Sequence, residues 1–195
     1  GAVGKHASRF LAAEGAVIVA AADSRGMVNC PNGLDVKQLA EIKAQGGSVV
    51  DYQAGAGVTT GDREAIIDVP CDIWIPAARP DVIRADNLDR LQAGMVVSGA
   101  NIAVTAEAEQ QLHDRGILCI PDFIANAGGV ICAAMEYQGA GEAMAMQAIE
   151  EKLCHNVQTI LELSKRQACL PREAAVDMAM QRVQKAMQLR RWSLF

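Results

Sequence analysis

Short apolar runs alternate with amphipathic stretches along most of the chain. The run GAVIVAAAD (15–23) is partly β-branched and ends in an acid, and CDIWIPAA (71–78), MVVSGAN (95–101) and ILCIPDF (117–123) are comparable apolar runs. Such runs are typical of strands buried on both faces of a parallel sheet. SVVDY (48–52) is expected to form a further short strand. The pattern therefore predicts five strands.

Helices are predicted between these strands. Residues 2–14 place Val3, Phe10 and Leu11 on one face of a helix, and Thr105 is expected to cap a later one. Further helices are expected at 35–47, 59–67, 87–94, 106–116 and from 126 to the end, with breaks near 139–141 and near 171. This alternation predicts an α/β fold with a doubly wound, mostly parallel sheet of the Rossmann type, helices on both faces and a C-terminal helical tail.

Two domains are expected within this fold. Residues 1–138 are predicted to form a dinucleotide-binding Rossmann domain, and residues 139–195 a helical extension that packs on or beside it. In a doubly wound sheet the first strand is central, and it should end just before Gly1. We therefore expect Gly1 to mark a cut or an incomplete record, and residues 1–195 to fold poorly alone.

Composition narrows the possible functions. The 195 residues are 51% hydrophobic and 21% charged, with a net charge of -5 and no basic run, which argues against nucleic acid and anionic membranes as partners. No apolar stretch has membrane-spanning length and nothing is typical of a signal peptide, so a cytoplasmic location is expected. The six cysteines are scattered without a CxxC pair, which predicts reduced thiols and no metal site.

Glycines and an acid near the start form the first candidate site. In GAVGKHASRF, Gly1 and Gly4 have the spacing of the second and third glycines of a dinucleotide turn. Asp23 follows Gly4 by nineteen residues and ends the next strand, where a carboxylate can accept bonds from both ribose hydroxyls. An ordinary strand–helix turn is the alternative for the glycines alone, and the position of Asp23 favours a dinucleotide site.

Loops after the later strands form the second candidate site. They are PAA (76–78), SGAN (98–101) and ANAGGV (125–130), and small residues there let a ring or ribose lie against backbone. Asn101 and Asn126 offer donors and acceptors that suit a carboxamide or ribose hydroxyls. A helix cap or turn is the alternative role for each asparagine taken singly.

A longer pattern connects these loops to a known family. SGANIAVTAEAEQQLHDRGILCIPDFIANAGGVI (98–131) resembles the cofactor domain of the glutamate/leucine/phenylalanine/valine dehydrogenases, and looks most like the glutamate dehydrogenase branch with its GAN…T..A…L…RG…PD..ANAGGV signature. ADSRGMVNCPNGLDVKQL and CDIWIPAARPDVI are similar to segments of that family in the same order. The resemblance runs from Gly1 to about Tyr137 and continues more weakly through LPREAAVDMAMQRVQKAM.

The resemblance implies cofactor contacts at the matching positions. These are Gly1, Ala2 and Val3 in the pyrophosphate turn, Asp23 and Ser24 at the adenosine ribose, Ala77 and Ala78 in the adenosine-side wall, and Asn101 and Asn126 on the nicotinamide side. NAD is favoured as the cofactor because of the acid at Asp23. NADP is the alternative, since Arg25 could pair with a 2′-phosphate.

Substrate contacts are implied at two positions. Val130 matches a position that touches substrate, and Ala133 stands where glutamate-specific members carry a serine that binds the distal carboxylate. Because alanine cannot donate that hydrogen bond, a branched-chain or apolar amino acid is the alternative to glutamate. Ser98 stands where many members have Glu, and no consequence is assigned to that difference.

No catalytic residue is predicted in this chain. The catalytic Lys and Asp of the family belong to an N-terminal substrate domain, no lysine here occupies a matching motif, and His6 is expected to be a surface residue. The chain alone is expected to be inactive, and its role is to position the nicotinamide for hydride transfer.

The predicted function of the complete enzyme is oxidative deamination of an L-amino acid, with glutamate first, to its 2-oxo acid and ammonium with NAD(P), in a homo-oligomer. A stand-alone NAD(H)-sensing module is one alternative. A methyltransferase that binds S-adenosylmethionine is another, against which the PAA and ANAGGV loops argue.

Overall fold

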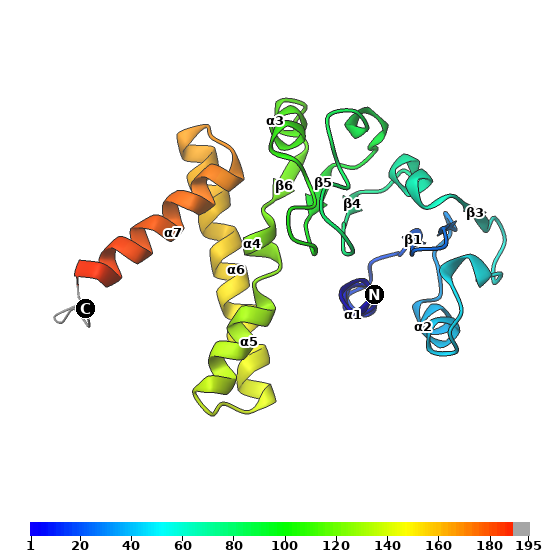
Figure 1. Ribbon diagram of the computed structural model, residues 1–195, viewed down its shortest axis with the longest axis horizontal. Coiled ribbons are helices and arrows are strands. Elements are labelled where there is room, and N and C mark those ends of the chain that lie inside the picture. The colour runs from blue at the N-terminus through cyan, green and yellow to red at the C-terminus, as the bar shows by residue number, and fades with distance from the viewer. Residues whose placement is uncertain (189–195) are drawn as a thin grey trace.

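A computed structural model describes residues 1–188, in which two small sheets and a set of helices follow one another along the long axis (Figure 1). Sheet A is antiparallel and has the order β1 (Ala20–Ala22), β2 (Met27–Asn29), β3 (Thr59–Gly61). Sheet B is parallel and has the order β4 (Ile73–Trp74), β5 (Met95–Val97), β6 (Leu118–Ile120). The predicted α/β class, with a parallel sheet and helices, is confirmed.

The pairing in sheet A differs from the predicted parallel arrangement. Residues 15–23 contribute only β1, which pairs antiparallel with β2, a segment predicted to be loop. The reason lies in the turn, because the Asp23 carboxylate accepts a hydrogen bond from Arg25 N–H at 2.9 Å, as in an Asx turn. Gly26 completes it, since a Cβ there would lie 2.7 Å from the carbonyl oxygen of Gly61. A tight hairpin replaces the expected loop.

The strand predicted at residues 48–52 is wrong. Val49–Asp51 forms a 3-10 helix, η1, which Ser48 and Asp51 cap reciprocally. Ser48 Oγ accepts from Val50 N–H at 3.4 Å, and the Asp51 carboxylate accepts from Ser48 N–H at 2.7 Å. Because both polar ends satisfy helix-terminal groups, they override the β preference of the two valines.

The predicted helices are present, with two of them shorter and tighter than expected. The α-helices are α1 (Ala2–Ala13), α2 (Val36–Ala44), α3 (Ala106–Asp114), α4 (Asp122–Ala125), α5 (Gly128–Tyr137), α6 (Glu142–Gln167) and α7 (Pro171–Gln188). Segments 59–67 and 87–94 contain the 3-10 helices η2 (Arg63–Asp68) and η3 (Leu88–Arg90). Thr105 caps α3 by accepting from Ala108 N–H at 3.3 Å, and the tail is broken where predicted. The end of the predicted tail, 189–195, lies outside the described residues.

Three hydrophobic clusters support the two sheets. One lies around Val96 of β5, the second around Val28 of β2, and the third joins Ile120 of β6 to Ile160 of α6. The predicted apolar face of α1 is not buried, because Val3 and Phe10 remain 49% and 50% exposed. The helix therefore contributes little to the packed interior of this chain.

An apolar groove of about 670 Å³ lies between sheet B and α6, and its lining contains none of the predicted site residues. No helix within residues 1–188 is long and apolar enough to cross a membrane. All six cysteines are free, and burial raises the pKa of the Cys119 thiol to about 12, which keeps it protonated and inert.

Candidate functional site

The N-terminus of α1 contacts the loops that follow β4 and β5. A Cβ on Gly99 would lie 3.1 Å from Val3 Cγ1, and a Cβ on Gly4 would lie 3.8 Å from Ala77 Cβ. Ala100 N–H donates to the carbonyl of Pro76 at 2.8 Å, which joins the two loops. The small residues let three backbone segments meet, as the sequence predicted for Val3 and Ala77.

The first turn of α1 exposes backbone donors. Gly1 is its N-cap and makes no side-chain cap bond, and no acidic side chain lies in the first turn. The first N–H groups of a helix have no acceptor within the helix, and the helix dipole adds positive potential there. A Cβ built on Gly1 would meet nothing within 4 Å, so the approach to these donors is open. Such a terminus can bind a phosphate group.

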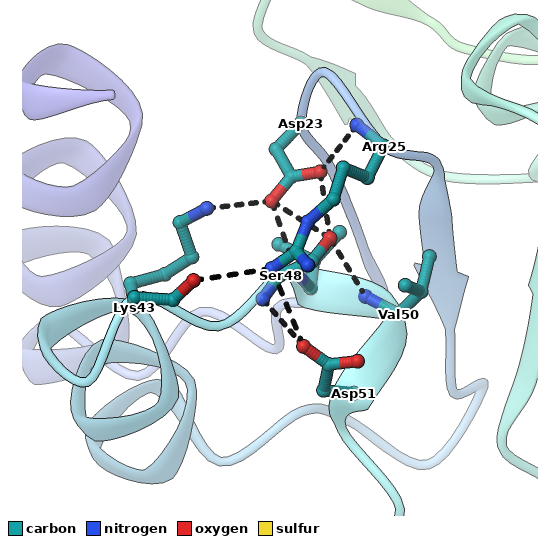
Figure 2. Close-up of polar contacts among 8 residues, drawn as sticks. Asp23, Arg25, Lys43, Ser48, Val50 and Asp51 are labelled. Atoms are coloured by element: carbon teal, nitrogen blue, oxygen red, sulfur yellow. Dashed lines mark hydrogen bonds and ion pairs between the residues drawn. The ribbon is translucent and has the colours of Figure 1, made fainter.

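Asp23, at the end of β1, is bound by four donors of the protein itself (Figure 2). Its Oδ1 accepts from Arg25 N–H at 2.9 Å and from Ser48 Oγ at 2.8 Å. Its Oδ2 accepts from Lys43 Nζ at 2.6 Å and from Val49 N–H at 3.1 Å. The Asp23 side chain is 10% exposed, whereas that of Lys43 is 38% exposed. Lys43 is therefore the partner most accessible to a competing ligand.

These contacts keep Asp23 ionised. Burial alone raises the pKa of its carboxyl, but the bonds from Lys43, Arg25 N–H, Ser48 and Val49 N–H outweigh burial and hold the pKa well below its usual range. A carboxylate has about four acceptor positions, so a ribose diol would replace one of the existing donors.

Arg25 is also engaged within the protein. Its guanidinium donates to the Gly46 carbonyl at 3.3 Å and lies 3.4 Å from the Asp51 carboxylate. Its side chain is 53% exposed, so the ion pair is weakly held and open to exchange. Arg25 and Lys43 place two positive charges beside Asp23.

Asn101 and Asn126 meet at the carboxyl ends of β5 and β6. Asn126 Nδ2 donates to Asn101 Oδ1 at 2.6 Å. This bond uses the oxygen of one amide and the nitrogen of the other. Within residues 1–188, Asn101 Nδ2 and Asn126 Oδ1 make no side-chain hydrogen bond, so the pair presents one donor group and one acceptor. That combination is complementary to a carboxamide.

The remaining predicted residues are exposed. Ser24 and Ala78 follow Asp23 and Ala77 directly and face solvent. Val130, which is 77% exposed, and Ala133 lie three residues apart on α5 and so share a face of that helix. The structure records no contact that joins either pair to the two asparagines.

The sequence analysis missed a buried ionic cluster behind the asparagines. Arg172 of α7 lies 2.5 Å from Glu109 Oε2 and 3.0 Å from Asp122 Oδ1, and Asp122 Oδ2 accepts from Ile102 N–H at 2.7 Å. Burial alone raises the pKa of Asp122, but the bonds from Ile102 N–H and Arg172 leave it below the ordinary value. Charged residues at the starts of two helices, PD and PR, were the available signal.

These features define an α/β protein in which a glycine-bearing helix N-terminus meets loops at the carboxyl ends of parallel strands, an arrangement typical of nucleotide-binding sheets. The chain belongs to the glutamate/leucine/phenylalanine/valine dehydrogenase family, whose sequence pattern matches residues 1–191.

Individual relatives agree with this assignment. The chain is 37% identical over 203 residues to a glutamate dehydrogenase from Aeropyrum pernix, covering 98% of this chain and 48% of the relative. It is 34% identical over 198 residues to an NADP-specific glutamate dehydrogenase from Saccharolobus shibatae, covering 97% and 46%. The chain thus spans about half the length of these relatives.

The fold agrees with a solved structure as well. The crystal structure of a hetero-hexameric glutamate dehydrogenase from Thermus thermophilus, in a leucine-bound form, is similar with a TM-score of 0.83 at 24% identity. The similarity covers 99% of this chain and 46% of that one.

Proposed function

We propose that this chain is the cofactor-binding part of an amino-acid dehydrogenase. The complete protein would oxidise an L-amino acid to its 2-oxo acid and ammonium with NAD(P). The observation that carries the proposal is the contact of the α1 N-terminus with the loops after β4 and β5, in a chain of this family. Residues 1–138 would form the dinucleotide domain and 139–195 its helical extension.

A further strand would complete the dinucleotide domain. Sheet A ends at β1 and sheet B ends at β4, and no backbone pairing joins these two edges within residues 1–188. The matched relatives are about twice as long as this chain. A strand from outside residues 1–195 that pairs with both edges would make one sheet from two.

The residues present fit a dinucleotide. Gly1, Ala2 and Val3 would bind the pyrophosphate through the first-turn donors of α1. Asp23 and Ser24 would hold the adenosine ribose, with Ala77 and Ala78 as a wall beside it. The cofactor, when bound, accepts hydride from the α-carbon of the substrate.

The two asparagines would orient the nicotinamide ring. Asn101 Nδ2 is free to donate to the carboxamide oxygen, and Asn126 Oδ1 is free to accept from the carboxamide nitrogen. Fixing the carboxamide fixes which face of the ring meets the substrate. This chain therefore acts by positioning, and the acid–base groups would lie in the other half of the complete protein.

NAD is the cofactor we propose first, because a carboxylate at Asp23 binds a ribose diol and repels a 2′-phosphate. The relative from Saccharolobus shibatae is named as NADP-specific, and Lys43 and Arg25 beside Asp23 offset that repulsion. NADP is therefore tested alongside NAD.

Glutamate is the substrate we propose first, because the matched relatives are glutamate dehydrogenases. Ala133 favours an apolar amino acid as the second candidate, since it offers no donor for a distal carboxylate. The complete enzyme is proposed to be a homo-oligomer.

The direct test is a calorimetric titration of the full-length protein that carries this chain with NADH, NADPH and S-adenosylmethionine. NADH is expected to bind, and Asn101→Ala and Asn126→Ala to weaken it, while Gln147→Ala on the exposed face of α6 leaves it unchanged. Binding of S-adenosylmethionine without NADH would reject the proposal. NADH binding without turnover of any amino acid would favour a sensing module.

The substrate is tested by giving α5 the missing donor. Ala133→Ser is expected to raise kcat/KM for glutamate relative to leucine by about tenfold or more, the effect of one hydrogen bond to a charged group. Ala134→Ser, also exposed on α5, is the matched control. An unchanged ratio would show that Ala133 does not face the distal carboxylate.

A further inference from the structure

We infer that Asp122 and Arg172 are positioning residues for the Asn101–Asn126 pair. The inference rests on the proposed function, in which that pair holds the nicotinamide carboxamide. Neither charged residue is proposed to touch the cofactor. They act by fixing the backbone from which the two amides extend.

Arg172 connects three helices. It lies at the start of α7 and binds Glu109 of α3 and Asp122 of α4, at 2.5 and 3.0 Å. The Glu109 and Asp122 side chains are 3% and 10% exposed, so each charge depends on Arg172 for neutralisation. A short helix, α4, is thereby anchored to two longer ones.

Asp122 passes this anchorage to the turn that carries Asn101. Its second oxygen accepts from Ile102 N–H at 2.7 Å, and Ile102 adopts a φ of 53°. A β-branched residue is disfavoured in that left-handed region, so bonds from neighbouring segments must hold it there. The Ile102 side chain is 62% exposed and adds no buried packing, and its carbonyl accepts from Asp81 N–H at 2.8 Å.

The same two segments are therefore joined twice. Asp122, at the start of α4, binds the backbone of residue 102, and Asn126, which caps the end of α4, binds the side chain of Asn101. The first bond is buried and charged, whereas the second is neutral and more exposed. We expect loss of the first bond to release the second, because charge-assisted bonds are the stronger kind.

The test measures NADH and ADP-ribose affinities in the full-length protein. ADP-ribose lacks the nicotinamide, so it reports the rest of the site. Arg172→Met and Asp122→Asn are expected to weaken NADH by about 5- to 10-fold, as for the loss of one or two neutral hydrogen bonds, and to change ADP-ribose by less than about twofold. Arg182→Met is the matched control, since Arg182 lies on α7 and donates only to Asn156.

Each outcome decides the matter. A selective loss of NADH affinity in either Arg172→Met or the isosteric Asp122→Asn supports the inference. An equal loss of both ligands, or no loss, overturns it and leaves the cluster a purely structural role. If the wild-type protein binds neither NADH nor NADPH, the proposed function fails first, and the inference fails with it.

Discussion

The two polar anchors of the proposed cofactor site differ in how much of their hydrogen-bonding capacity the protein already uses. At the sheet A end, four donors of the protein occupy both oxygens of Asp23. At the sheet B end, Asn101 and Asn126 bind each other once and keep one donor group and one acceptor free. A ligand must exchange partners at the first anchor but can add bonds at the second.

The local folds explain this difference. The turn after β1 places Asp23 over the N-terminus of η1, where Ser48 and Val49 N–H point towards an anion. The asparagines instead lie on loops whose backbone is fixed from behind by Arg172 and Asp122. Stability and binding therefore compete for the same atoms at Asp23, whereas separate atoms serve them at the asparagines.

Removing the Asp23 carboxylate should have the largest effect on stability. Asp23→Ala leaves Ser48 and Val49 N–H without their acceptor in a buried region, and we expect the free energy of unfolding to fall by about 2–4 kcal/mol. Urea unfolding measures this. Asp62→Ala is the control, since the Asp62 side chain makes no cap bond to η2. Equal small losses in the two variants would contradict the central role of Asp23.

Acid should weaken the Asp23 end more than the Asp122 end. Both carboxyls have folded-state pKa values below 3.8, with the larger lowering at Asp23, so the unfolded chain binds protons more readily. Their stabilisation is complete above the unfolded pKa and is lost as the pH falls below about 4.

The measurement compares urea unfolding midpoints at pH 7 and pH 3. The drop in stability should be reduced most in Asp23→Asn, less in Asp122→Asn, and not at all in Asp62→Asn. A drop in Asp23→Asn as large as that of the wild type would show that its contacts do not persist in solution.

Lys43→Met should sharpen the choice of cofactor. It frees Asp23 Oδ2 for a ribose hydroxyl and removes a positive charge from the place where a 2′-phosphate would lie. We expect the ratio of NADH to NADPH affinity to rise about tenfold, the effect of one charge-assisted bond. Lys37→Met on α2 is the control, because Lys37 forms no ion pair within residues 1–188. A ratio that falls would show that Lys43 supports ribose binding.

The smallest effect is expected where α1 meets the sheet B loops. Gly99→Ala brings a Cβ to 3.1 Å from Val3 Cγ1 and should destabilise the protein by about 1 kcal/mol. Gly129→Ala lies in α5 with nothing within 4 Å of the added Cβ, and should stabilise the protein by up to about 1 kcal/mol. Thermal unfolding compares the two, and a stabilised Gly99→Ala would mean that the contact is loose.

The sequence predicted the parts of this molecule that depend on neighbouring residues. Helix α3 with its Thr105 cap and the break before Pro171 both follow from local chemistry, and both are present. The hairpin after β1 and the helix η1 are local as well, but their signals, an Asx turn and a capping box, were outweighed by apolar runs.

The occupancy of the candidate site could not be predicted in the same way. Lys43 and Ser48 lie 20 and 25 positions from Asp23, and Arg172 lies 50 positions from Asp122. A sequence pattern identifies a carboxylate, but which cations reach it depends on how the helices pack. Whether a polar side chain is free for a ligand is thus a property of the tertiary fold.

The separation of sheets A and B has a consequence for the length of ligand that the protein can hold. Asp23 follows β1 and Ala77 follows β4, and these strands are the facing edges of two unjoined sheets (Figure 1). A single strand paired with both would set β1 and β4 about 10 Å apart, because neighbouring strands lie about 4.8 Å from each other. The span between the two anchors would then be fixed by the repeat of the peptide backbone, and side-chain substitutions at either end would change affinity without changing reach.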